Sequence, residues 1–241
     1  MSDELPLERV AEASDADTAE IAAPASASWT GQVGDPVRLL LLRHGQTELS
    51  VGRRYSGHGD PELTQLGHEQ AAAAAVRLAA TEPDIAAIVS SPLWRARQTA
   101  AAVAEATNAP LRVHDGLIET DFGAWEGLTF AEARTRDPEL HGRWLGRDDV
   151  APPGGESFAA VAERITAVRE ELVEEFAGAT LLVVSHVTPI KLFLRDALAG
   201  GPEILYRMHL DLAGLSEVSF YPDGGASVRL VNDTSHHPPK R

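Results

Sequence analysis

The chain has 241 residues, a formal net charge of −15 at neutral pH and no cysteine. This length fits one large domain or two small ones. The negative charge argues against non-specific nucleic-acid binding and against attraction to an anionic membrane. The lack of cysteine excludes disulfides, thiolate metal sites and a cysteine nucleophile. No apolar run approaches the roughly 18 residues of a membrane-spanning helix, and no secretory signal opens the chain, so we expect a cytoplasmic protein.

The N-terminal segment differs in composition from the rest of the chain. Residues 1–35 hold eight of the carboxylates but one arginine, and they lack a sustained apolar face. This composition is typical of a disordered acidic tail or an interdomain linker. We expect residues 36–232 to form the folded domain and residues 233–241 to be a frayed tail.

Predicted strands alternate with predicted helices along the folded part. Strands are expected at Val37–Leu42, Ile85–Ser90, Leu111–Val113 and Leu181–Val184, and helices at Gly67–Ala80, Pro92–Thr107, Ser157–Phe176 and Thr188–Leu198. Strands at Leu215–Tyr221 and Ser227–Asn232 flank a turn-forming Pro-Asp-Gly-Gly and should form an antiparallel hairpin at the sheet edge. The sequence therefore predicts an α/β three-layer sandwich with a mostly parallel sheet and helices on both faces.

Two long connections interrupt this alternation. The loop over residues 43–66 is long for a plain connector, and such loops inside compact domains are usually functional. The segment over residues 128–157 begins with a short helix near Phe130–Thr135 and is then rich in proline and glycine. We expect this segment to be a flexible cap that determines specificity.

Charged and polar residues follow several of the predicted strands. They are Arg43 with His44, then Arg95, Glu119 and His186. If these strands are parallel neighbours, the residues converge at one edge of the sheet, where ligands of open α/β sheets bind. Guanidinium groups suit bidentate contact with phosphate, and helix N-termini after Pro92 and Thr188 also favour anions. The pattern predicts a cationic pocket for an anionic substrate in an otherwise acidic protein.

Four ordered segments at residues 42–47, 91–99, 119–127 and 184–186 resemble the histidine phosphatase superfamily, also called the phosphoglycerate-mutase-like family. The likeness spans residues 37–198 and is greatest to the α-ribazole phosphatase-like branch. Residues 184–191 are similar to the phosphatase domain that some actinobacterial proteins carry behind a ribonuclease H domain.

The resemblance implies a role for each of these residues. His44 would attack phosphorus and become a phosphohistidine, while Arg43, Arg95 and His186 would hold the phosphoryl oxygens. Glu119 would be the general acid and then the general base, with Asp121 and Glu126 as weaker candidates for the same role. The remaining phosphate-binding positions would be Gly45, Thr47, Ser50, Ser56, Gly57 and Val187. No metal or other cofactor is implied.

The chain departs from the family pattern at two of these positions. Ser50 stands where many members have asparagine, and Ser56 stands where phosphatases often have glutamine. Both replacements shorten the side chain, so the individual contacts at these positions are open.

The expected function is a metal-independent phosphatase for small phosphorylated metabolites, either an acid phosphatase or similar to α-ribazole phosphatase. One alternative is a phosphoglycerate mutase, although the cap is shorter than the basic cap that mutases usually carry. Another is a catalytically idle phosphate-binding module of the same fold. The chain could also be fused to, or work with, a ribonuclease H domain.

Overall fold

A computed structural model describes residues 31–237 of the chain, so most of the expected N-terminal tail and the last four residues lie outside the described residues. Its sheet has six strands in the order β3-β2-β4-β1-β5-β6. They are β1 (Val37–Arg43), β2 (Ile85–Ser90), β3 (Leu111–Val113), β4 (Thr180–Ser185), β5 (Leu215–Phe220) and β6 (Ala226–Asp233). The first four strands in this order are parallel, and β5 and β6 are antiparallel to their neighbours. The expected fold class is confirmed.

Strand β1 lies inside the sheet and is buried on both faces, which explains its run of four leucines. Leu39 and Leu41 pack in the core on one side of the sheet, and Leu40 and Leu42 pack in the core on the other side. Successive side chains of a strand point to opposite faces, so one apolar run supplies both cores.

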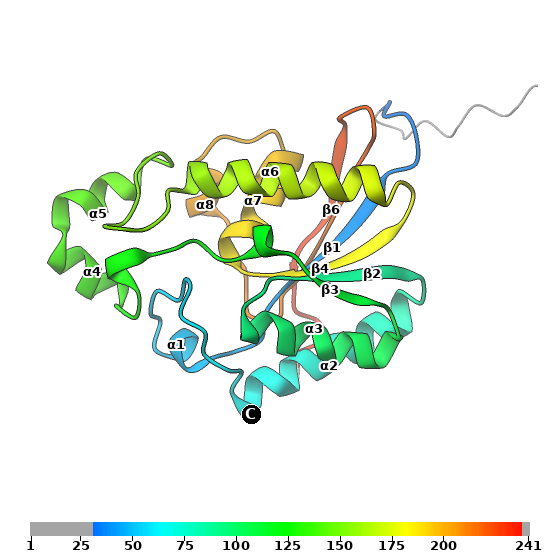
Figure 1. The fold of residues 1–241 in the computed structure, drawn as a ribbon, viewed down its shortest axis with the longest axis horizontal. Helices are drawn as coiled ribbons and strands as arrows, with labels where there is room; N and C mark the ends of the chain where they lie inside the picture. Colours follow the sequence, from blue (N-terminus) through cyan, green and yellow to red (C-terminus); the bar gives the residue numbers. More distant parts are fainter. Residues whose placement is uncertain (1–30, 238–241) are drawn as a thin grey trace, which may run out of the picture.

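The two faces are covered by different helix pairs (Figure 1). Helices α2 (Gln65–Thr81) and α3 (Trp94–Thr107) cover one face, and α6 (Phe158–Glu175) and α7 (Val187–Ala197) cover the other. Thr64 is the N-cap of α2, and its hydroxyl accepts from the backbone N–H of Gly67. Helix α3 starts at Trp94 with Leu93 as its N-cap, so the expected place of Pro92 in the first turn was wrong. Short helices α1 (Glu48–Val51) and α8 (Ile204–Arg207) complete this part.

The cap contains two helices, α4 (Phe130–Arg136) and α5 (Pro138–Trp144). We did not predict α5, because Gly142 and the flanking prolines suggested an irregular segment. Pro138 occupies the first turn, where its missing N–H costs nothing, and His141 and Trp144 bury one face. The indole Nε1 of Trp125 donates to Asp137 at 2.7 Å, so the cap is fastened to the chain that precedes it.

The end of the chain also contacts the body of the domain. Asp233 ends β6 and pairs with Arg77 of α2 at 2.7 Å, and the Nε2 atom of His236 lies 2.9 Å from the carbonyl oxygen of Ala213. Asp233 and His236 therefore contact the body of the domain, and the rest of the expected tail, residues 238–241, lies outside the described residues. Within residues 31–237, no helix is long and apolar enough to cross a membrane.

Candidate active site

The carboxyl ends of three neighbouring strands bring the candidate residues to one edge of the sheet. Arg43 pairs in register with Ser185, and Ser90 pairs with Val184. The backbone N–H of His44 then donates to the carbonyl of Ser185 at 3.0 Å. The rings of His44 and His186 consequently lie with centroids 5.1 Å apart, although 142 positions separate them in the sequence.

The ring of His44 is held in one tautomer by its own neighbour. Its Nδ1 atom lies 2.7 Å from the carbonyl oxygen of Gly45. A carbonyl can only accept a hydrogen bond, so Nδ1 carries the proton and Nε2 carries the lone pair. Burial, and then the charges of Arg43 and Arg95, lower the pKa of His44 well below its usual value. The ring is therefore neutral, as a nucleophile must be.

His186 is fully buried, and only one of its two ring nitrogens has a hydrogen-bond partner within residues 31–237. Its Nε2 atom lies 2.7 Å from the hydroxyl of Ser91, whereas its Nδ1 atom has no hydrogen-bond partner within the described part of the chain. Burial, followed by the charge of Arg95, lowers the pKa of His186 as well. A neutral ring with Ser91 donating to Nε2 presents an N–H at Nδ1, which suits a phosphoryl oxygen.

Arg43, which is half-buried, supplies one of two cations beside the histidines. Its Nη1 atom donates to the carbonyl of Leu210 at 2.6 Å, and its Nε atom has no partner among residues 31–237. Burial lowers the pKa of Arg43 to about 10, so the guanidinium is still charged at neutral pH. An unpaired buried donor is costly, and a phosphate oxygen would satisfy it.

Arg95 supplies the second cation and is held by the long loop after β1. Its Nη1 atom donates to the carbonyl of Gly59 at 2.7 Å, and its Nη2 atom donates to those of Ser56 and Gly57 at 3.1 and 2.9 Å. Its Nε atom has no partner within the described residues. Burial lowers the pKa of this guanidinium. The loop carbonyls thus fix the orientation of Arg95.

The same loop is held in turn by the carboxylate of Glu126. This carboxylate accepts hydrogen bonds from the backbone N–H of Gly57 at 2.8 Å and of Gly59 at 3.1 Å. A Cβ atom at Gly57 would overlap the carbonyl oxygen of Thr120, so no larger residue fits there. Glu126 is therefore committed to the loop, which leaves it poorly placed to act as the acid.

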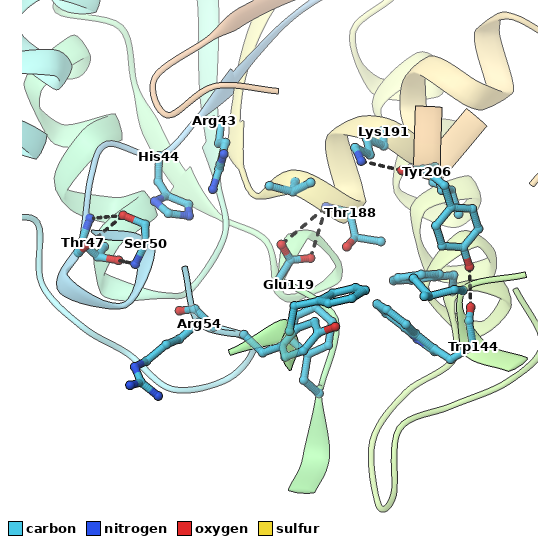
Figure 2. A pocket seen from close by; sticks show the side chains of 18 residues that line it. Arg43, His44, Thr47, Ser50, Arg54, Glu119, Trp144, Thr188, Lys191 and Tyr206 are labelled. Atoms are coloured by element: carbon cyan, nitrogen blue, oxygen red, sulfur yellow. Dashed lines mark hydrogen bonds between the residues drawn. The ribbon is translucent and has the colours of Figure 1, made fainter. Parts of the chain in front are cut away.

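Glu119 lines the same cavity as Arg43 and His44 (Figure 2), whereas Arg95 and His186 are fully buried and do not line it. Glu119 is 5% exposed, and its Oε1 atom accepts from the backbone N–H of Thr120 at 2.9 Å and of Thr188 at 3.3 Å. Asp121 instead accepts from the N–H of Gly123 at 2.7 Å. Of the three carboxyls that we considered, only Glu119 lines the cavity in the described structure.

The structure divides the other expected phosphate-binding residues into two groups. Thr47, Ser50, Ser56 and Val187 line the cavity, and Gly45 and Gly57 do not. The N–H of Gly45 already donates to Thr99 at 3.1 Å. Ser50 donates to the carbonyl of Thr47 at 2.7 Å and accepts from its N–H, so it closes the first turn of α1. The buried hydroxyl of Ser56 has no partner in residues 31–237 and remains available.

The cavity has a volume of about 440 Å³ and extends well beyond the histidines. Its far wall consists of aromatic residues that sequence reasoning did not assign to the site: Tyr55, Phe122, Phe130, Trp144, Phe158 and Tyr206. Four of them lie in or next to the cap in the sequence, whereas Tyr55 comes from the loop after β1 and Tyr206 from α8. Within residues 31–237, no group of three or more His, Asp or Glu side chains could hold a metal ion.

Comparison with known proteins agrees with this geometry. A family model described as histidine phosphatase superfamily (branch 1) matches residues 39–234. The chain belongs to the histidine phosphatase superfamily. Relatives of this family include the bifunctional protein Rv2228c of Mycobacterium tuberculosis, which is 58% identical over 227 residues. That alignment covers 93% of this chain and 62% of the relative, so the chain spans less than two thirds of that protein.

Solved histidine phosphatase structures have the same fold. A mycobacterial glucosyl-3-phosphoglycerate phosphatase superposes with a TM-score of 0.75 at 31% identity, covering 83% of this chain and all of the other. A putative α-ribazole-5′-P phosphatase from Escherichia coli superposes with a TM-score of 0.73 at 28% identity, covering 83% of this chain and 97% of the other. Both of these structures carry the name of a phosphatase.

Proposed function

We propose that the chain is a metal-independent phosphatase that hydrolyses small phosphomonoesters through a phosphohistidine at Nε2 of His44. The observation that carries this proposal is the pair of histidine rings 5.1 Å apart, both neutral and both beside guanidinium groups. Such an arrangement combines a nucleophile with positive charge for the phosphoryl oxygens.

The proposed first step transfers the phosphoryl group to the enzyme. The Nε2–P bond forms as the bond between phosphorus and the ester oxygen breaks, and Glu119 gives its proton to that oxygen. The Nε atoms of Arg43 and Arg95 and the Nδ1–H of His186 lack other partners in the described chain and would bind the phosphoryl oxygens. Their charge offsets the charge that spreads over these oxygens during transfer.

The second step returns the enzyme to its starting state. Glu119 takes a proton from water, whose oxygen attacks phosphorus as the N–P bond breaks. The products are the alcohol and inorganic phosphate. Glu119 accepts from the N–H of Thr188 in the first turn of α7 and lines the same cavity as His44, which supports both uses of this carboxyl.

The natural substrate is proposed to be a small phosphorylated metabolite, as for an acid phosphatase or an α-ribazole phosphatase-like enzyme. The chain covers 62% of its bifunctional mycobacterial relative. We therefore also propose that it acts in the cytoplasm as the phosphatase part of a longer protein or together with a ribonuclease H domain.

A phosphate-release assay with a chemical trap tests the proposal. The 241-residue chain is expected to release phosphate from p-nitrophenyl phosphate in the presence of EDTA. Turnover is stopped by alkaline denaturation, because phosphohistidine is acid-labile. Mass spectrometry of the denatured protein should then locate a phosphoryl group on His44. His44→Ala should abolish both signals. Loss of activity with EDTA would contradict metal independence.

The same preparation separates phosphatase from mutase and from an idle module. Phosphate release that does not depend on 2,3-bisphosphoglycerate indicates a phosphatase. Interconversion of phosphoglycerates only when that compound is present would indicate a mutase. Phosphate binding without turnover at acidic to neutral pH would indicate a binding module.

A further inference from the structure

The cavity wall opposite the histidines is unusually rich in aromatic side chains. Phe, Trp and Tyr make up 5% of the chain, with 6 Phe, 4 Trp and 3 Tyr. Six of these thirteen line this one cavity: Tyr55, Phe122, Phe130, Trp144, Phe158 and Tyr206. In Figure 2, Trp144 and Tyr206 lie on the side of the cavity away from Arg43 and His44, with Glu119 between them. The cavity therefore has a cationic end and an aromatic end.

The hydroxyl groups at the aromatic end already have partners inside the protein. The hydroxyl of Tyr55 lies 3.0 Å from Nε2 of His141, and that of Tyr206 donates to the carbonyl of Trp144 at 2.6 Å. The rings of Tyr55 and Trp144 meet edge to face, with centroids 5.8 Å apart. These residues can therefore contact a ligand through the surfaces of their rings, because their hydroxyl groups are already hydrogen-bonded.

Two further cations, Arg54 and Lys191, line the cavity, and each contacts a neighbouring backbone carbonyl. Arg54 donates to the carbonyl of Gly127 at 2.8 Å and pairs with Glu132 at 3.1 Å. The ammonium group of Lys191 donates to the carbonyl of Leu205, and burial lowers its pKa. An ammonium group has three donors and a guanidinium five, so these contacts occupy only part of each cation. A substrate carboxylate can still bind there, and its effect has to be measured against that of a ring.

We propose that this site selects phosphomonoesters whose alcohol ends in a flat aromatic ring, with the phosphate at His44 and the ring against the cap. This inference rests on the phosphatase function proposed above and adds a substrate class to it. Aromatic rings prefer offset or edge-to-face contact with other rings, and a cavity of about 440 Å³ is within the usual size range of ligand pockets.

The test compares two substrates that differ in the ring and not in the reactivity of the leaving group. Ethyl phosphate and 2-phenylethyl phosphate are both esters of primary alcohols. We expect kcat/KM to be about tenfold or more higher for 2-phenylethyl phosphate, because burying a phenyl ring against apolar surface favours its binding. 2-Cyclohexylethyl phosphate should fall between the two, since it is apolar but not flat.

Variants locate this selectivity at the cap. Phe130 lines the cavity and is 46% exposed, so its replacement leaves the core intact. Phe130→Ala should reduce the ratio between the two substrates several-fold, and Phe130→Leu should reduce it less. Leu198→Ala is the matched control, because Leu198 is 49% exposed and lies outside the cavity lining. It should leave the ratio unchanged.

The outcomes separate this inference from the phosphatase function. Equal kcat/KM values for the ethyl and phenylethyl esters would overturn the aromatic selectivity and leave the phosphatase function standing. Faster turnover of 3-phosphoglycerate than of 2-phenylethyl phosphate would also overturn it. Phosphate release from none of these esters would overturn the phosphatase function and, with it, this inference.

Discussion

The hydroxyl of Ser91 lies 2.7 Å from Nε2 of His186, and both side chains are fully buried. The same hydroxyl accepts a hydrogen bond from the backbone N–H of Leu93 at 3.3 Å. The hydroxyl of Ser91 has one proton to donate, and Nε2 of His186 is the only acceptor that it contacts among residues 31–237, so we assign Ser91 as the donor. Ser91 thereby places the ring proton of His186 on Nδ1, the nitrogen that has no other partner among residues 31–237.

Ser91→Ala should therefore lower kcat for p-nitrophenyl phosphate by about tenfold, the effect of losing one hydrogen bond that orients a catalytic group. Ser90→Ala is the matched control, because Ser90 is equally buried but donates to the carbonyl of Ser91 and not to a histidine. The measurement is kcat and KM of both variants, with their urea midpoints. Equal losses of kcat in the two would show that burial and not the tautomer is responsible.

Glu119→Gln should lower the rate of hydrolysis most for substrates whose leaving group has to be protonated. The loss for an alkyl phosphate is expected to be about 10²- to 10⁴-fold, the usual contribution of a general acid. The loss for p-nitrophenyl phosphate should be far smaller, because nitrophenolate leaves without a proton. Steady-state kinetics with both esters makes the measurement. Asp121→Asn serves as the control, and an equal loss for both esters in Glu119→Gln would count against Glu119 as the acid.

Glu126→Ala should weaken phosphate binding through the loop and not through direct contact. Its carboxylate holds the N–H groups of Gly57 and Gly59, and the carbonyls of those residues hold Arg95. We expect the inhibition constant of inorganic phosphate to rise about tenfold, which corresponds to about 1.4 kcal/mol. Glu171→Ala removes a carboxylate that pairs with His114 at the surface, and it should leave this constant unchanged.

The pKa values of the two buried histidines predict how stability depends on pH. Both rings have pKa values well below 6.5 in the folded chain, because burial disfavours their charged forms. Below pH 6.5 the unfolded chain binds protons that the folded chain does not, so the free energy of unfolding falls as pH falls. Each such histidine contributes up to about 1.4 kcal/mol per pH unit in this range.

Urea denaturation between pH 7.5 and pH 5 measures this dependence. His44→Ala should have a shallower decline than the unsubstituted chain, by up to about 1.4 kcal/mol per pH unit. An unchanged slope would mean that the ring of His44 is protonated in the folded chain, which is incompatible with its role as a neutral nucleophile.

The sequence was sufficient to predict which residues at the ends of the parallel strands come together. Arg43 ends β1, His44 and His186 come directly after β1 and β4, and the parallel pairing of these strands brings the residues together. The loop contacts of Arg95 could not be predicted, because they run from its guanidinium to backbone carbonyls 36 to 39 positions away. Every residue has a backbone carbonyl, so residue type does not indicate which carbonyls accept from a guanidinium.

The aromatic wall was missed for a related reason. Its residues come from the loop after β1, the segment before the cap, the cap itself, α6 and α8. None of these segments has a periodic pattern that predicts where the rings meet. Helix α5 was missed because Gly142 lowers its intrinsic preference for helix, whereas burial of His141 and Trp144 stabilises it.

The close approach of Gly45 to Gly67 restricts which residues can stand at these two positions. A Cβ atom at Gly45 would overlap the carbonyl oxygen of Gly67, and one at Gly67 would overlap that of Gln46. The main chain beside His44 therefore rests directly on the first turn of α2, with no side chain between them. Any attempt to transplant the proposed nucleophile into another scaffold must carry both glycines along with His44.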